Sequence, residues 1–271
     1  MSGGFIRLEL LDLIIASSLL FVSAGASLSL RLGLERGLAI AAVRMVVQLT
    51  LLALVLKILF ALVSPLWTGL AAAFMLLVAG WEVRARQKTR FDGFWTYGIA
   101  TTTLFFAGSL VTLLALTTQL RPEPWFDPRY ALPILGMILG NSLNGASLAL
   151  DRLMGTVARE KAAIEAQLAL GADIHQALGP LVRDAARAGM MTIINSMSAS
   201  GVVFIPGLMT GQVLAGVPPA EAVKYQIIIM FLIAGANALG VTGMLVLARY
   251  RLTDSRHRLR LDRLKVARDR L

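Results

Sequence analysis

The sequence alternates long apolar runs with short polar connections. A helix that crosses a bilayer needs about 20 mainly apolar residues, and runs of this order recur along the whole chain. Residues 58–81 carry no charge, but Ser64-Pro65 interrupts them, which favours a helix end followed by a second, shorter span. The pattern therefore predicts an all-α integral membrane protein with about seven transmembrane helices. The expected spans are 10–30, 38–62, 66–81, 95–119, 131–150, 189–216 and 222–248.

The first apolar run has one feature of a secretory signal, because the small residues Ser23-Ala24-Gly25-Ala26 lie at its end. The residues before it carry one Arg and two nearby acids, whereas a signal peptide begins with a basic segment. We therefore interpret this run as a retained first helix.

Two segments are too polar to be spans. In 151–188, apolar residues at helical spacing interleave with charges and Gly171 marks a turn, which predicts a helix–turn–helix. The tail, 251–271, is basic, and we expect it to form an interfacial or frayed helix near anionic lipid headgroups. The chain is thus expected to consist of a transmembrane domain, 1–250, and this basic tail.

Positive charge is concentrated on alternate connections. The connections that contain 31–36, 84–90 and 151–188, together with the C-terminal segment from Arg249 to Arg270, hold 20 of the 26 Lys and Arg residues. Because basic loops stay in the cytoplasm, this asymmetry predicts an outside N-terminus and a cytoplasmic long connection and tail. The expected location is a bacterial plasma (inner) membrane, crossed several times. The net charge of +10 is explained by this topology, so no nucleic-acid partner is expected.

The composition excludes several kinds of site. The chain has no Cys, which excludes disulfides, thiolate metal sites and thiol nucleophiles. The two histidines, His175 and His257, lack metal-binding spacing, so the sequence assigns no metal ligands. The sequence contains no G-x-x-x-x-G-K-[ST] string and no Gly-Lys dipeptide. We therefore expect the chain to bind no nucleotide or other cofactor and not to be an enzyme.

One short motif lies in the long connection. The string Glu165-Ala166-Gln167-Leu168-Ala169-Leu170-Gly171-Ala172 has the form E-A-x-x-x-L-G-A and resembles the EAA loop of ABC importer permeases. In such a loop a helix presents an acidic and small-residue face, and Gly allows a sharp turn into a second helix. The resemblance implies that a cytoplasmic ABC ATPase subunit docks on this chain through the residues Glu165, Ala166, Leu170, Gly171 and Ala172.

Longer strings resemble the FetB-type iron-exporter permeases and the similar plant aluminium-tolerance permeases. The strings are Leu135-Gly136-Met137-Ile138-Leu139-Gly140-Asn141, Leu170-Gly171-Ala172, Ile205-Pro206-Gly207-Leu208-Met209-Thr210-Gly211 and Ala215-Gly216-Val217-Pro218-Pro219-Ala220-Glu221-Ala222-Val223-Lys224-Tyr225-Gln226. This resemblance implies the permease subunit of an ATP-driven (ABC) transporter that exports iron or another metal, with ATP and Mg bound by a separate ATPase. Because seven helices and one coupling loop are half of the usual assembly, we expect a homodimer with two ATPase copies.

Polar residues inside the expected spans are the candidate translocation path, because each is costly in hydrocarbon and normally faces a bundle interior or a cavity. Arg44 and Gln48 share one face of the second span, and Arg44 could bind an anion, pair with an acid or extend to the headgroups. The amides either line a path or join helices. These amide residues are Asn141, Asn144, Asn195 and Asn237.

Glycine and proline suggest two further features of the expected spans. Pro206-Gly207 lies inside a long apolar run and predicts a broken or kinked helix, which points to a pathway. The G-x-x-x-G spacings of Gly136 with Gly140 and of Gly207 with Gly211 favour close helix packing.

Two other functions stay open. A secondary transporter without an ATPase would more often show an ionisable site at mid-membrane or two similar halves, and no Asp or Glu lies near a span centre. A seven-helix receptor of the retinal type needs a Lys near the middle of the last span, whereas Lys224 lies at its edge.

Overall fold

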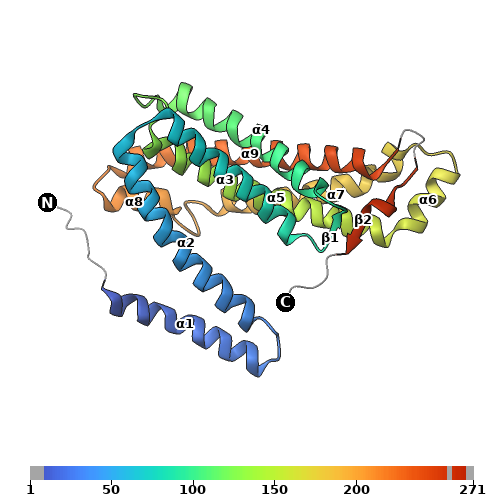
Figure 1. Cartoon of the computed structure of the whole chain (residues 1–271), viewed down its shortest axis with the longest axis horizontal. Coiled ribbons are helices and arrows are strands. Elements are labelled where there is room, and N and C mark those ends of the chain that lie inside the picture. Colours follow the sequence, from blue (N-terminus) through green and yellow to red (C-terminus); the bar gives the residue numbers. More distant parts are fainter. Residues whose placement is uncertain (1–8, 255–257, 267–271) are drawn as a thin grey trace.

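The computed structural model describes residues 9–254 and 258–266, and these are almost entirely helical, which confirms the expected all-α membrane fold (Figure 1). A π-helical turn, η1, extends α4, and a 3-10 turn, η2, precedes the second of two short strands. The elements are α1 (Leu10–Ser29), α2 (Glu35–Leu62), α3 (Pro65–Arg86), β1 (Thr89–Phe91), α4 (Trp95–Leu114), η1 (Ala115–Leu120), α5 (Pro128–Arg159), α6 (Lys161–Ala169), α7 (Ile174–Ala199), α8 (Gly207–Leu214), α9 (Pro219–Leu252), η2 (Leu261–Arg263) and β2 (Leu264–Val266).

Six helices of the described chain are long and apolar enough to cross a membrane, where seven spans were expected. They are α1, α2, α3, α4 with η1, α5 and α9. The expected span at 189–216 is not one helix, because α7 starts far earlier, at Ile174, and ends at Ala199. Residues 200–206 then separate it from the short α8. Gly201 has φ +81°, and Pro206 lacks a backbone N–H, so both oppose a continuous helix here.

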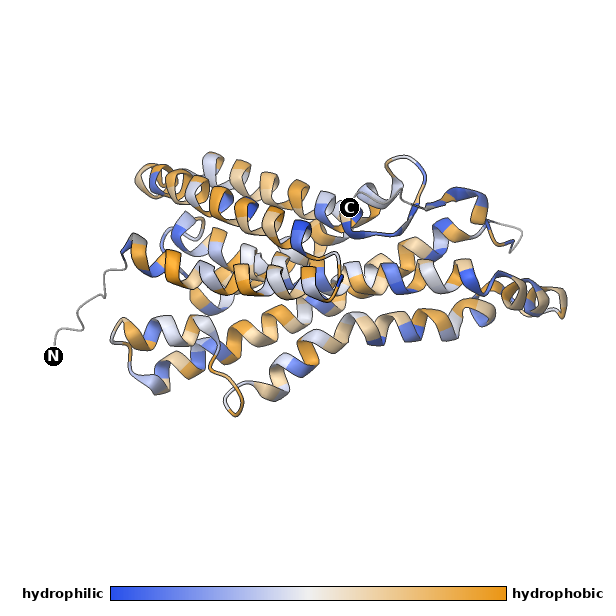
Figure 2. Cartoon of the chain, turned by 90° about the horizontal axis from the view of Figure 1, so that it is seen from below, coloured by the Kyte–Doolittle hydropathy of each residue, from blue (hydrophilic) through white to orange (hydrophobic). Residues whose placement is uncertain are grey.

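Five helices, α3, α4, α5, α7 and α9, pack into the bundle, with α5 in contact with the other four. Their shared core includes the fully buried side chains of Leu104, Met154 and Met244. Helices α1 and α2 lie at its periphery (Figure 1), and only 6% of the apolar stretch of each is buried. Apolar residues predominate along the helices (Figure 2), and many of the large ones are exposed. An apolar exterior of this kind is what a lipid-facing surface requires.

Tryptophan and tyrosine mark two levels of the bundle, which correspond to membrane interfaces because these residues concentrate there. On α3, Trp67 and Trp81 are about 21 Å apart along the helix axis, and Tyr225 and Tyr250 on α9 are about 38 Å apart. These spacings bracket the roughly 30 Å of hydrocarbon in a bilayer. We call the end with the α2–α3 turn the turn end, and the end from which α6 projects the hairpin end. The turn end has Trp67, Trp125, Tyr130 and Tyr225, and the hairpin end has Trp81, Trp95, Tyr97 and Tyr250.

The tail folds back on the hairpin end instead of continuing as a helix. Strand β2 pairs antiparallel with β1, and Phe91 lies opposite Leu264. The Lys265 ammonium beside Asp92 lowers the pKa of that carboxyl. Arg260 donates two hydrogen bonds of 2.8 Å to Asp262 and holds the pKa of that carboxyl at about 2. The expectation of a tail helix is therefore wrong for the described tail residues 258–266. Its apolar residues Leu259, Leu261 and Leu264 pack against the bundle core.

Helices α5 and α7 approach each other closely at Gly145 and Gly189. A Cβ atom on either glycine would lie 2.7 Å from the carbonyl oxygen of the other, and neither backbone can move aside easily. A Cβ on Gly140, Gly207 or Gly211 would meet no atom within 4 Å. The expectation that these three glycines provide close packing is therefore wrong, because the spacing alone does not show which face meets a neighbour.

Candidate functional site

The turn between α6 and α7 is a Schellman motif. The N–H of Gly171 donates to the carbonyl of Leu168 at 3.1 Å, and the N–H of Ala172 donates to the carbonyl of Gln167 at 3.1 Å. Gly171 has φ +93°, a conformation that residues with a Cβ adopt only with strain. The expected helix–turn–helix, with its turn at Gly171, is therefore present. We call residues 161–178 the α6–α7 hairpin.

One side of the α6–α7 hairpin packs against the bundle. Ile164 is 2% exposed and Leu178 is fully buried, and both belong to the same core as α5 and α9. A capping box fixes the start of α7, since Asp173 and Gln176 exchange side-chain to backbone hydrogen bonds of 2.7 and 3.1 Å. The hairpin is therefore a rigid extension of the bundle.

The other side of the hairpin is open. Leu170, at its tip, is 89% exposed, which is unusual for a leucine at an ordered turn. Ala166 is also exposed, and exposed Glu165 lies 3.7 Å from Lys161 one helical turn earlier. The tip thus offers a protruding apolar side chain beside a paired acid and a small residue. Such a surface can enter a complementary groove of a partner.

Two long helices connect the hairpin to the membrane-spanning bundle. Helix α5 continues without interruption to Arg159, and α7 runs from Ile174 past Gly189 to Ala199. Arg152 Nε donates a 2.7 Å hydrogen bond to Asp184 Oδ2 and joins the two helices. The hairpin is therefore joined to the bundle by two long helices that are themselves linked by a side-chain hydrogen bond.

Arg44 pairs with an acid, which was one of its three expected roles. It forms an ion pair with Glu82 of α3. Glu82 Oε2 also lies 3.7 Å from Arg86 Nε, and Arg86 Nη1 donates a 2.5 Å hydrogen bond to Asn144 Oδ1 of α5. We call these four residues the Arg44 network. It connects α2, α3 and α5 at the level of Trp81, close to the hairpin-end interface.

Sequence analysis missed Glu82, because it follows directly after the expected span 66–81. A usable signal was the tight α2–α3 turn. Arg44 lies 18 residues before Leu62, and Glu82 lies 17 residues after Pro65. Two antiparallel helices that share a short turn place such positions at about the same depth. The comparison of these two distances would have predicted the pair.

The Glu82→Gln variant will lose about 1–3 kcal/mol of stability, because it leaves Arg44 and Arg86 beside each other without their shared acid. The measurement is thermal unfolding of the purified chain in lipid nanodiscs. Glu221→Gln is the matched control, because Glu221 pairs with Lys224 at 2.7 Å but both side chains are more than half exposed. We expect this control to change stability by less than about 0.5 kcal/mol. Equal losses of stability in the two variants would contradict a stabilising role for the Arg44 network.

The structure does not bring the remaining candidate path residues together in one site. Asn237 is 1% exposed and its Nδ2 donates a 3.3 Å hydrogen bond to the Gly189 carbonyl, so it joins α9 to α7. Gln48, Asn141 and Asn195 are exposed on α2, α5 and α7 respectively. Asn141 donates only to the carbonyl of Met137 in its own helix, at 2.8 Å. These three amides are exposed at membrane depth. Contact of a polar side chain with lipid hydrocarbon is unfavourable.

The helix break extends over residues 200–206, and Pro206 is the N-cap of α8, which begins at Gly207. Ala199 lies about 15 Å beyond Gly189 along α7, so the break falls within the membrane-spanning part of the bundle. Val202 and Val203 are 88% and 80% exposed, and α8 packs on α9. Irregular backbone at this depth requires protein or a water-filled cavity around it.

Titratable side chains do not form a metal-binding cluster in residues 9–254 and 258–266, where no group of three or more His, Asp and Glu could hold an ion. His175 is in the first turn of α7 and exposed. His257 lies outside the described residues.

Comparison with known proteins places these features in a family. The family described as "Uncharacterised protein family (UPF0014)" matches residues 10–253. The chain is 38% identical over 200 residues to "UPF0014 membrane protein slr1647" of Synechocystis, covering 72% of this chain and 75% of that protein. It is 32% identical over 254 residues to "Probable iron export permease protein FetB" of Escherichia coli, covering 94% and 96%.

A plant relative is also similar. The chain is 31% identical over 210 residues to "Protein ALUMINUM SENSITIVE 3" of Arabidopsis thaliana, covering 78% of this chain and 75% of that protein. No solved structure matches the chain.

Proposed function

Because the chain belongs to the UPF0014 family of membrane proteins, we propose that it is the membrane-spanning permease subunit of an ATP-driven (ABC) transporter. Its cargo is iron or another metal, which it exports from the cytoplasm. The cargo and the direction are taken from the relative FetB, whose name describes iron export. The protein is a multi-pass membrane protein, and we place it in a bacterial plasma membrane.

The observation that carries this proposal is the α6–α7 hairpin. A separate ATPase must pass the energy of nucleotide hydrolysis to the membrane helices through a rigid contact. The hairpin supplies an exposed Leu170 at its tip and buried Ile164 and Leu178 at its base. It continues into α5 and α7, so force applied at the tip reaches Gly145 and Gly189 inside the bundle. ATP and Mg are bound by the ATPase, and this chain is not an enzyme.

The hairpin end faces the cytoplasm in this proposal. The connections at that end carry most of the Lys and Arg residues, in agreement with the rule that basic loops remain cytoplasmic. The turn end, including the start of α1, then faces the outside.

The exposed amides favour an assembly of two copies of this chain. Gln48, Asn141 and Asn195 lie open at membrane depth on three helices of one chain. Enclosure of these faces between two copies would remove the amides from lipid and give them water or a polar cargo as a neighbour. The functional unit is therefore a homodimer with two ATPase copies, and the path lies between the two chains. Amide and carbonyl oxygens are suitable hard ligands for a passing metal ion.

The test is purification of the tagged chain from its own membranes, followed by reconstitution in vesicles with any ATPase that co-purifies. We expect a stoichiometric ATPase and ATP-dependent uptake of Fe²⁺ into vesicles whose hairpin end faces the added ATP. Absence of an ATPase would refute the ABC assignment and favour a secondary transporter or a receptor. If an ATPase co-purifies but the vesicles take up no metal, the assignment as an ABC permease stands and the assignment of a metal cargo is refuted.

A further inference from the structure

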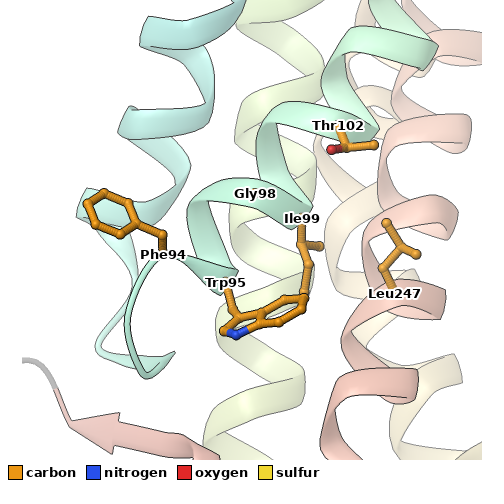
Figure 3. Close-up of a pocket in the computed structure, with 6 residues that line it drawn as sticks. All are labelled: Phe94, Trp95, Gly98, Ile99, Thr102 and Leu247. Atoms are coloured by element: carbon orange, nitrogen blue, oxygen red, sulfur yellow. The ribbon is translucent and has the colours of Figure 1, made fainter.

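A continuous groove runs along the outside of the bundle between α4 and α9. Its first part is a cavity of about 480 Å³ lined by Phe94, Trp95, Gly98, Ile99, Thr102 and Leu247 (Figure 3). A second cavity of about 300 Å³ shares Thr102 and Leu247 with the first and continues along Phe106 and Leu110 of α4. The two cavities therefore form one apolar groove between two membrane-spanning helices.

The groove is long enough to hold an acyl chain across one lipid leaflet. It begins at Trp95 in the hairpin-end aromatic level and extends to Leu110, about 22 Å along α4. One leaflet contributes about 15 Å of hydrocarbon, so an acyl chain can follow the groove through its whole leaflet. A Cβ on Gly98 would meet no atom within 4 Å, which shows that the missing side chain leaves part of this space.

The mouth of the groove is positively charged. On α9 the groove-facing residues recur every four positions, and the next one after Leu247 is Arg251. The Arg251 guanidinium lies 4.1 Å from the centre of the Trp95 ring, and the Arg84 guanidinium lies 5.0 Å from the centre of the Phe94 ring. Two arginines thus flank the two aromatic residues at which the groove opens.

Neither of these arginines has an acidic partner in the described chain. The Nε atoms of Arg84 and Arg251 are buried without a hydrogen-bond partner in the described chain, and neither residue forms an ion pair there. The nearby carboxylates are already engaged, Asp262 by Arg260 and Asp92 by Lys265. An apolar groove that has guanidinium groups without ion-pair partners at the interface complements an anionic lipid, whose phosphate and acyl chain need both features.

We propose that the α4–α9 groove binds an anionic phospholipid of the hairpin-end leaflet, with one acyl chain along Gly98 and Leu247 and the headgroup phosphate between Arg84 and Arg251. This site does not depend on the identity of the transported cargo. It also lies away from the α6–α7 hairpin.

The test uses a variant that keeps Trp95 as its only tryptophan, with phenylalanine at 67, 81 and 125, in phosphatidylcholine bilayers. Quenching of Trp95 fluorescence is compared between brominated phosphatidylglycerol and brominated phosphatidylcholine at equal content. We expect the anionic lipid to quench preferentially. Arg251→Gln should lower this preference by about fivefold, and the added change Arg84→Gln should lower it further. Gly98→Phe should reduce quenching by both lipids.

Lys88→Gln is the control, because it removes an exposed positive charge at the same end, outside the groove. A loss of preference as large as that of Arg251→Gln would show general surface attraction and overturn the proposal. Equal quenching by the two lipids in the parent protein would also overturn it. If neither lipid quenches Trp95, a second copy of the chain covers the groove and the proposal is wrong.

Discussion

Replacement of Gly145 by leucine will lower the stability of the bundle by about 3 kcal/mol or more. The first added carbon already lies 2.7 Å from the Gly189 carbonyl oxygen and also collides with the buried side chain of Asn237. Relief requires separation of α5 from α7, because the Gly189 carbonyl belongs to the backbone and cannot turn aside as a flexible side chain could. The apparent Tm in detergent, followed by tryptophan fluorescence, should fall by about 10 °C.

Gly140→Leu is the matched control for this result. It makes the same chemical change on the same helix, but its Cβ would meet no atom within 4 Å. We expect a Tm close to that of the parent protein. A comparable fall in the control would mean that leucine in α5 is harmful for another reason, and the close contact would not explain the loss.

If the proposed function is correct, replacement of Leu170 by aspartate will strongly weaken association with the proposed ATPase subunit while leaving the fold intact. The side chain is 89% exposed and contributes nothing to the core, so the chain's own stability should change by less than about 0.5 kcal/mol. A charge placed in a desolvated docking pocket should weaken binding at least about tenfold. The measurements are the ATPase recovered per mole of tagged chain and the ATP hydrolysis that the complex supports.

Ala158→Asp controls for charge in this experiment. Ala158 is exposed near the end of α5, so the variant adds the same negative charge close to the base of the hairpin. We expect it to retain the ATPase. Loss of binding in both variants would indicate long-range repulsion, and full binding by Leu170→Asp would show that the hairpin tip is not the docking element.

The hydrophobic pattern alone predicted the helical membrane fold and the helix–turn–helix, because both depend on local signals. A long run of apolar residues has few alternatives to a spanning helix. A glycine that follows a stretch of helical pattern, as Gly171 does, commonly ends the helix. The break after Ala199 was harder to place. Residues 200–206 remain apolar, so hydropathy continues across the point where the helix stops.

The long-range contacts could not be predicted in the same way. The Arg44–Glu82 pair could be inferred from residue counts on either side of the α2–α3 turn, but the contact of Arg86 with Asn144 on α5 could not. Gly145 has no second glycine four residues away, since its partner Gly189 is on α7. The pairing of β1 with β2 joins segments more than 170 residues apart, and the basic composition of the tail gave no indication of it. Contacts of this kind can be identified only when the packing of the helices is known.

The uninterrupted course of α5 from Pro128 to Arg159 has a consequence for how this protein tolerates changes in length. One residue inserted between 146 and 158 would turn everything beyond it by about 100° and move it about 1.5 Å along the axis. The hairpin would then point away from its present direction, although every side chain was retained. The same insertion in 121–127, before the helix begins, would leave the rotation of the hairpin relative to the rest of α5 unchanged. Helix α5 thus sets both the distance and the angle between the membrane and the exposed tip.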